Sequence, residues 1–171
     1  MTFLRLLTIW LVFASQGALA DDKRFGAWAV GATTDKDALY AATVNDSNAV
    51  LGQYCFVSDR NCVWLLGNDV NCDTDGSYVI LMNSDYSAHT LEIMCFKADG
   101  KSKFAFKDFE QIDTAIKKSS YIGFAFPMQN GNFKVSRFNL SGALKAVQFM
   151  RGVAEKFPQD GNRKSTRDQT L

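Results

Sequence analysis

The chain has 171 residues, and 19 Lys and Arg against 18 Asp and Glu give it a formal net charge of +1 at pH 7. This near neutrality argues against a nucleic-acid partner, because binding to a phosphate backbone usually depends on a strongly basic surface. The length suits one domain with a sizeable core, and 14 Phe residues predict that the core is aromatic.

The first 20 residues have the layout of a secretory signal peptide. A short segment with the single charge of Arg5 precedes an apolar run over residues 6–13, and the small residues of 18–20 form a cleavage signal. We therefore expect residues 1–20 to be removed and the protein to be periplasmic or secreted. No later segment is apolar for long enough to cross a bilayer, so no transmembrane segment is expected in the mature chain.

Short apolar runs separated by turn residues follow the signal sequence. They predict strands at 25–32, 38–45, 49–56, 62–66, 78–82, 90–96, 102–106, 121–128 and 133–138. The last two runs are joined through Asn130-Gly131, which is a strong signal for a β-hairpin. Pro127 predicts that its strand ends there or lies at an edge of the sheet.

Two segments have helical rather than alternating periodicity. Phe109, Ile112 and Ile116 predict a short helix over 109–118. A second helix follows Ser141, which we expect to cap it, and its apolar face comprises Leu144, Val147, Met150 and Ala154. From residue 158 to 171 the sequence is polar without periodicity, which predicts a disordered tail.

All four cysteines lie between Cys55 and Cys95. In an exported chain an even number of cysteines indicates disulfides, although four cysteines allow three pairings. The pairs Cys55–Cys62 and Cys72–Cys95 are favoured, because each pair flanks a predicted turn and could meet across antiparallel strands.

Together these elements predict a mainly β protein. The expected fold is an antiparallel β-sandwich or barrel-like domain with two short helices, stapled by disulfides, over residues 21–157.

The two ends of this domain resemble those of a known family. Phe25-Gly26-x-Trp28 at the start and Leu140-x-Gly142-x-x-x-Ala146-Val147 at the end are similar to the invasion-associated locus B family. That resemblance implies an exported bacterial β-sandwich, linked in some pathogens with host-cell invasion, and supplies no catalytic residue. The spacing of the four cysteines is this chain's own.

One acidic loop has part of a calcium-binding pattern. Asn71, Asp73 and Asp75 offer oxygen ligands at alternate positions before Gly76, but Met82 stands where a bidentate Glu is expected. An Asp-rich turn is the simpler interpretation. A zinc site is disfavoured, because there is one histidine and the cysteines are expected to be oxidised.

No coherent catalytic set is found. His89 is the single histidine and lies beside no nucleophile motif. Paired carboxylates for glycoside hydrolysis could come from turn residues, namely Asp46, Asp59, Asp69, Asp73, Asp75 and Asp85.

Two further groups of side chains have both a functional and a structural interpretation. A set of lysines forms an anion- or membrane-facing patch or protects an edge strand; it comprises Lys97, Lys101, Lys103 and Lys107, with Lys117 and Lys118 after the helix. The aromatic residues of the last hairpin line a groove or fill the core; they are Tyr121, Phe124, Phe126, Phe133 and Phe138.

The sequence therefore favours an exported, non-enzymatic binding domain that needs no cofactor and engages a protein or an envelope component. Alternatives are a small hydrolase using loop carboxylates, or a carrier with an apolar cavity for a small ligand.

Overall fold

The computed structural model describes residues 22–98 and 100–156, so the predicted signal peptide and the tail over 158–171 lie outside the described residues. The strands are β1 (Lys23–Phe25), β2 (Trp28–Ala32), β3 (Ala38–Val44), β4 (Val50–Phe56), β5 (Cys62–Gly67), β6 (Ser77–Ser84), β7 (Ala88–Ala98), β8 (Lys101–Phe106), β9 (Tyr121–Pro127) and β10 (Phe133–Asn139). The helices are α1 (Phe109–Lys118) and α2 (Ala143–Ala154).

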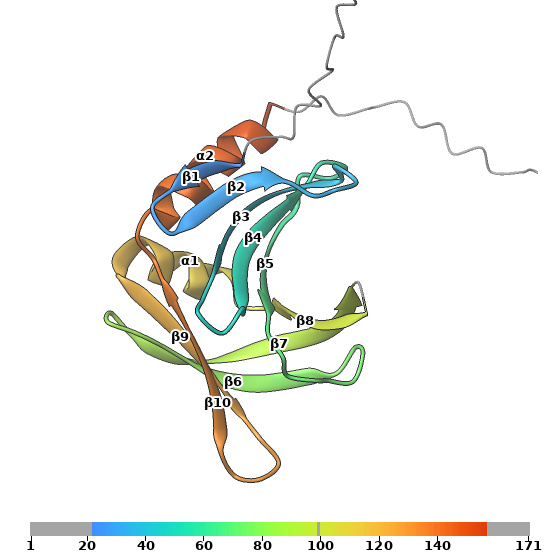
Figure 1. The fold of residues 1–171 in the computed structure, drawn as a ribbon, viewed down its shortest axis with the longest axis vertical. Coiled ribbons are helices and arrows are strands. Elements are labelled where there is room, and N and C mark those ends of the chain that lie inside the picture. Colours follow the sequence, from blue (N-terminus) through green and yellow to red (C-terminus); the bar gives the residue numbers. More distant parts are fainter. Residues whose placement is uncertain (1–21, 99, 157–171) are drawn as a thin grey trace, which may run out of the picture.

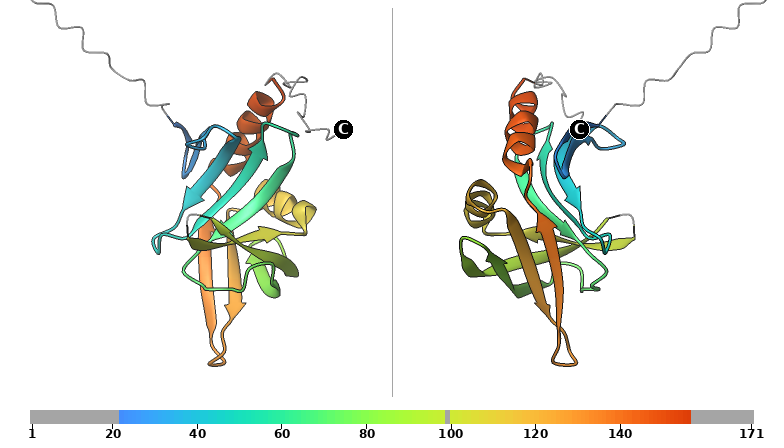
Figure 2. Two further views of the ribbon diagram at one scale, coloured as in Figure 1. Left: turned by 90° about the vertical axis from the view of Figure 1, so that its right-hand side faces the viewer. Right: turned by 60° about the vertical axis from the view of Figure 1, so that its left-hand side comes forward.

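These strands form a single antiparallel sheet in the order β1-β2-β3-β4-β5-β8-β7-β6-β9-β10. The sheet is strongly curled, and the β9–β10 hairpin extends away from the helices (Figures 1 and 2). Its two edge strands do not pair with each other, so the sheet stays open. Curling still brings β10 to the first strands: the Trp28 Nε1 donates to the carbonyl of Asn139 at 3.0 Å, and Asn45 Nδ2 to that of Arg137 at 3.1 Å. The predicted mainly β, antiparallel, disulfide-stapled fold with two helices is therefore confirmed.

One face of the curled sheet holds the core. Alternation along each strand sends Trp28 of β2, Trp64 of β5, Phe104 of β8 and Phe124 of β9 inward, where they are almost fully buried. Helix α2 packs against β1 to β4, and α1 packs against β5 and α2. Side chains from both halves of the sheet thus form the aromatic core that the sequence predicted.

Two local predictions were wrong for the same reason. The strand expected over 25–32 is divided by a turn at Gly26, and α2 begins after Gly142, whose φ is +85°, with no side-chain cap from Ser141. A Cβ on Gly142 would lie 1.9 Å from the carbonyl oxygen of Phe25, and one on Gly26 would lie 2.6 Å from that of Ser141. The β1–β2 turn and the start of α2 therefore touch backbone to backbone, which only glycine permits.

The two disulfides join Cys55 to Cys62 and Cys72 to Cys95, the pairing that the sequence favoured. Cys55 and Cys62 are direct partners in β4 and β5, with 4.0 Å between their Cα atoms. The expectation that both pairs cross adjacent strands was wrong for Cys72, which lies in the loop before β6 and ties that loop to β7. Formed disulfides indicate an oxidising environment.

Candidate functional site

The outer face of the sheet carries an open hollow that no helix covers. It has a volume of about 710 Å³ and lies over β3, β4 and β5, between the β2–β3 turn on one side and the end of β7 with the first half of β8 on the other. Its apolar lining consists of half-buried side chains that alternate with the core residues. We call this hollow the aromatic groove, defined by Tyr40, Val50, Tyr54, Phe56, Leu65 and Phe96.

Two tyrosines form the middle of the aromatic groove. The rings of Tyr40 and Tyr54 lie side by side on paired residues, with their centroids 6.0 Å apart. Tyr40 donates its hydroxyl proton to Asp22 Oδ1 at 3.0 Å, and a Cβ on Gly31 would lie 2.6 Å from that hydroxyl oxygen. Glycine at position 31 therefore leaves the space in which the Tyr40 ring lies.

Both tyrosines stay neutral well above physiological pH. The pKa of Tyr40 is raised to about 12, first by burial and then by the hydrogen bond to Asp22 and the negative charge of that residue. Burial also raises the pKa of Tyr54. The groove consequently presents uncharged aromatic surfaces, which favours apolar ligands.

Charged side chains stand at the two ends of the aromatic groove. Asp35 and Asp37 belong to the β2–β3 turn at one end, and Lys103 of β8 lies at the other. A second hollow of about 420 Å³ continues past Lys103, shares Val50, Gly67 and Lys103 with the first, and is lined mostly by polar residues. Within the described residues the side chain of Lys103 forms no ion pair or hydrogen bond, so its ammonium group is available to an anion.

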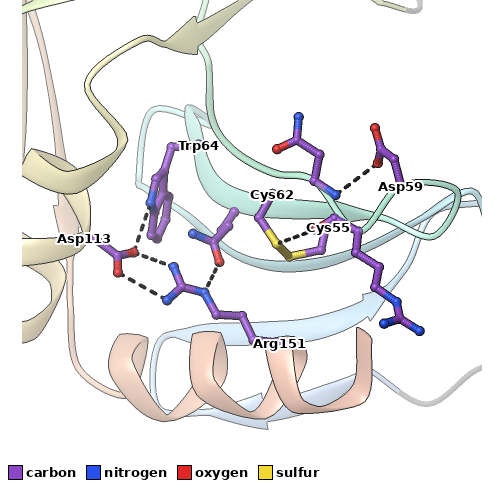
Figure 3. Close-up of a disulfide and its surroundings, with 9 residues drawn as sticks. Cys55, Asp59, Cys62, Trp64, Asp113 and Arg151 are labelled. Carbon is purple, nitrogen blue, oxygen red and sulfur yellow. Dashed lines mark hydrogen bonds and ion pairs between the residues drawn. A yellow bond between two sulfur atoms is a disulfide. The ribbon is translucent and has the colours of Figure 1, made fainter. Parts of the chain in front are cut away.

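A separate buried cluster fixes the helices on the opposite face of the same strands (Figure 3). Asp113 of α1 is 4% exposed and receives two hydrogen bonds from Arg151 of α2, at 2.5 and 3.2 Å, and one from Trp64 Nε1 at 3.3 Å. Arg151 Nε also donates to Gln53 Oε1 of β4 at 2.7 Å. Lys117 Nζ lies 3.3 Å from the Asp113 carboxylate.

This Asp113 cluster is structural in character. Burial alone would raise the pKa of Asp113. Arg151 lowers this pKa through its hydrogen bonds and its positive charge, and Lys117 adds to the effect in the same two ways, so the net shift is downward. The carboxylate is thus held ionised by partners on α1, α2 and β5, and is occupied on both oxygens.

The acidic loop singled out in the sequence is held by its backbone. Asp75 has a φ of +65° and donates its N–H to the carbonyl of Cys95, while the Asp73 N–H donates to the Tyr78 hydroxyl. In the described part of the chain, no group of three or more His, Cys, Asp or Glu side chains is placed to hold a metal ion. Calcium binding by Asn71, Asp73 and Asp75 stays a prediction.

The other acidic turn residues have partners of their own. Asp69 pairs with Lys134 at 2.8 Å, and Asp85 accepts hydrogen bonds from the Ser120 backbone N–H and hydroxyl. Asp59 accepts from the Asn61 N–H. His89 is an exposed residue of β7 opposite Met82. A hydrolytic role for these groups remains a prediction.

Of the two groups with alternative interpretations, the lysines of β8 do not protect an edge strand, and most of the aromatic residues fill the core. β8, which carries Lys101 and Lys103, lies between β5 and β7, so the interpretation as a protected edge strand was wrong. Phe124, Phe126 and Phe138 are buried in the core, whereas Tyr121 and Phe133 are exposed.

The sequence reasoning missed the aromatic groove. Its tyrosines alternate with apolar residues on strands that are covered on one face, and alternation does not reveal which face carries the larger hollow. The neighbouring small residue Gly31 was the available signal.

The fold resembles that of a known protein at low sequence identity. The crystal structure of invasion associated protein b from Bartonella henselae matches with a TM-score of 0.58 and 12% identity, over 79% of this chain and 99% of that one. No family model and no curated protein matches the sequence. The likeness supports the resemblance seen at the two ends of the domain and shows the fold alone.

No helix in the described residues is long and apolar enough to span a membrane.

Proposed function

We propose that the protein is an exported, non-enzymatic binding protein that engages an envelope component through the aromatic groove. The observation that carries the proposal is the open hollow of about 710 Å³ on a sheet face, lined by half-buried aromatic side chains. Its volume lies within the range of about 300–1,000 Å³ that is usual for ligand sites. Export is supported by the signal sequence predicted over residues 1–20 and by the two disulfides.

The groove also suits binding better than catalysis. Its titratable tyrosines are held neutral by burial, and the most buried carboxylate of the fold, Asp113, lies on the other face with both oxygens occupied. The acids Asp35 and Asp37 stand at one exposed end of the groove, where Asp37 accepts a hydrogen bond from the Thr33 hydroxyl at 2.7 Å.

Site-specific photo-crosslinking tests the proposal. Photoreactive benzoylphenylalanine in place of Phe56 is expected to capture an envelope molecule from membranes of the source organism, and mass spectrometry would identify it. The matched control replaces Phe133, which is 55% exposed on β10 away from the groove, with the same amino acid.

A second change asks whether capture depends on the groove itself. Leu65→Glu adds a charge to the apolar lining and should abolish capture at Phe56. Leu81→Glu, at a leucine that is 49% exposed on β6 outside the groove, should leave capture unchanged. Identical adducts from the two photoreactive positions, or capture that survives Leu65→Glu, would contradict the proposed function.

A further inference from the structure

The aromatic groove has an apolar length, one cationic end and one acidic end. It runs along β4, whose outward side chains Val50, Tyr54 and Phe56 all line it. Six residue steps of about 3.3 Å separate Val50 from Phe56, so the apolar stretch is roughly 20 Å long. Val50 is next to Gly67, which is paired with Lys103, whereas Phe56 is paired with Ala38 beside the acidic β2–β3 turn.

The sheet face offers an occupant no backbone hydrogen bonds. β3, β4 and the part of β5 that lines the groove, residues 65–67, pair on both sides, so their backbone groups are used within the sheet. An extended peptide in the groove would lose water from its own N–H and C=O groups without gaining partners, which is costly. A hydrocarbon chain has no such groups, and its burial against aromatic side chains is favourable.

Charge then decides which way such a chain lies. The Lys103 ammonium group is unpaired within the described residues, and the stem of this side chain lies over Gly67, with Nζ 3.4 Å from the position that a Cβ would take there. Lys101 lines the second hollow beyond it, together with Asp69, whose carboxylate is paired with Lys134 at 2.8 Å. Asp35 and Asp37 at the far end would repel an anion.

We infer that the aromatic groove binds a long-chain fatty-acid anion, with the acyl chain along β4 and the carboxylate against Lys103. This inference rests on the proposed function and names the chemistry of its ligand. At about 1.2 Å of advance per bond, as in an extended polypeptide, roughly 16 bonds cover the 20 Å of apolar groove. The match in length points to a chain of about that many carbons.

Calorimetric titration of the full mature protein with saturated fatty acids from octanoate to octadecanoate tests this. Because the groove covers one side of the chain, each added methylene is expected to raise affinity about twofold until the groove is filled near hexadecanoate, after which affinity levels off. Hexadecanol, which has no charge, should bind about fivefold more weakly than hexadecanoate, and acetate should not bind.

Two lysine variants separate the carboxylate contact from surface charge in general. Lys103→Met keeps the length of the side chain and should weaken hexadecanoate binding about fivefold while leaving hexadecanol unchanged. Lys145→Met, on the exposed face of α2, should change neither. Equal effects of the two variants, or an affinity that ignores chain length, would overturn the inference.

Competition with the photo-crosslink distinguishes the two proposals. If hexadecanoate binds and blocks capture at Phe56, both stand. If Phe56 captures an envelope molecule that hexadecanoate neither displaces nor resembles, the fatty-acid inference fails and the proposed function survives. If Phe56 captures nothing specific and no fatty acid binds, both fail.

Discussion

At the scale of single residues, Asp113 is a buried carboxylate that depends on charged and polar partners. It is a carboxylate at 4% exposure on the helix face that also carries Phe109, Ile112 and Ile116. Arg151 of α2 and Trp64 of β5 meet it there, so one charge connects both helices to the sheet. A polar residue on the apolar stripe of a helix is a sign of a buried partner, and this sign was present in the sequence.

Removing this carboxylate should be costly. Asp113→Ala leaves Arg151 half-buried without its main partner, and we expect the free energy of unfolding to fall by about 3–5 kcal/mol in urea titrations. Asp69→Ala removes a carboxylate of an exposed ion pair and serves as the control, with no measurable change expected. Similar losses in the two variants would show that Asp113 does not anchor the helices.

The same carboxylate sets a pH dependence. The pKa of Asp113 is lowered from its ordinary value of 3.8 in the folded protein, so its contribution is complete above that value and is lost as the pH falls through the folded pKa. The midpoint temperature of thermal unfolding should therefore fall more steeply with decreasing pH below 3.8 for the wild type than for Asp113→Asn. Parallel curves would contradict the assignment.

At the scale of elements, the sequence predicted most of the secondary structure but not its junctions. The helix over 109–118 was found with its observed bounds, because its apolar residues recur at 3.6-residue spacing. The start of α2 was misplaced, since the preference of Ser141 for a cap is local, whereas the need for glycine at 142 comes from Phe25, far away in the chain. The aromatic groove escaped prediction likewise, because it forms only when β2 and β8 flank β3 to β5.

That junction also explains the resemblance at the two ends of the domain. The first motif places Gly26 and Trp28 against the second, through the Trp28 bond to Asn139 and the Ala27 N–H bond to the Ser141 carbonyl. Leu140, Ala146 and Val147 of the second motif are buried in the core. The residues of the two motifs thus close one end of the fold.

One substitution made at two places in the same segment tests the junction. Gly142→Ala forces a Cβ into the Phe25 carbonyl at positive φ, and we expect a loss of about 2–4 kcal/mol in unfolding free energy. Gly152→Ala lies within α2, where a Cβ would meet no atom within 4 Å apart from the helix's own backbone. It should instead raise the unfolding free energy by about 0.5–1 kcal/mol. The opposite signs would be measured by urea denaturation, and a loss at both sites would argue against a specific contact.

At the scale of the whole molecule, the two disulfides constrain very different lengths of chain. Each joins one fully buried cysteine, Cys55 or Cys95, to a partly buried one, so the loss of packing on removal is similar. Their sequence separations are 7 for Cys55–Cys62 and 23 for Cys72–Cys95. The longer loop contains the β6–β7 hairpin and begins in the acidic loop, which is otherwise attached to β7 by the backbone bonds of Asp75 and Gly76 with Cys95.

Removing the Cys72–Cys95 disulfide, which closes the longer loop, should consequently lower the unfolding free energy more than removing Cys55–Cys62. By the entropy of loop closure, Cys72→Ala/Cys95→Ala should lower the unfolding free energy by about 3 kcal/mol and Cys55→Ala/Cys62→Ala by about 2 kcal/mol. The first variant should also increase hydrogen exchange at the backbone amides of positions 75 and 95, since the disulfide holds the loop against the strand, while the second should not. A greater cost for the Cys55–Cys62 variant would mean that strain or packing, rather than loop length, decides what each staple contributes.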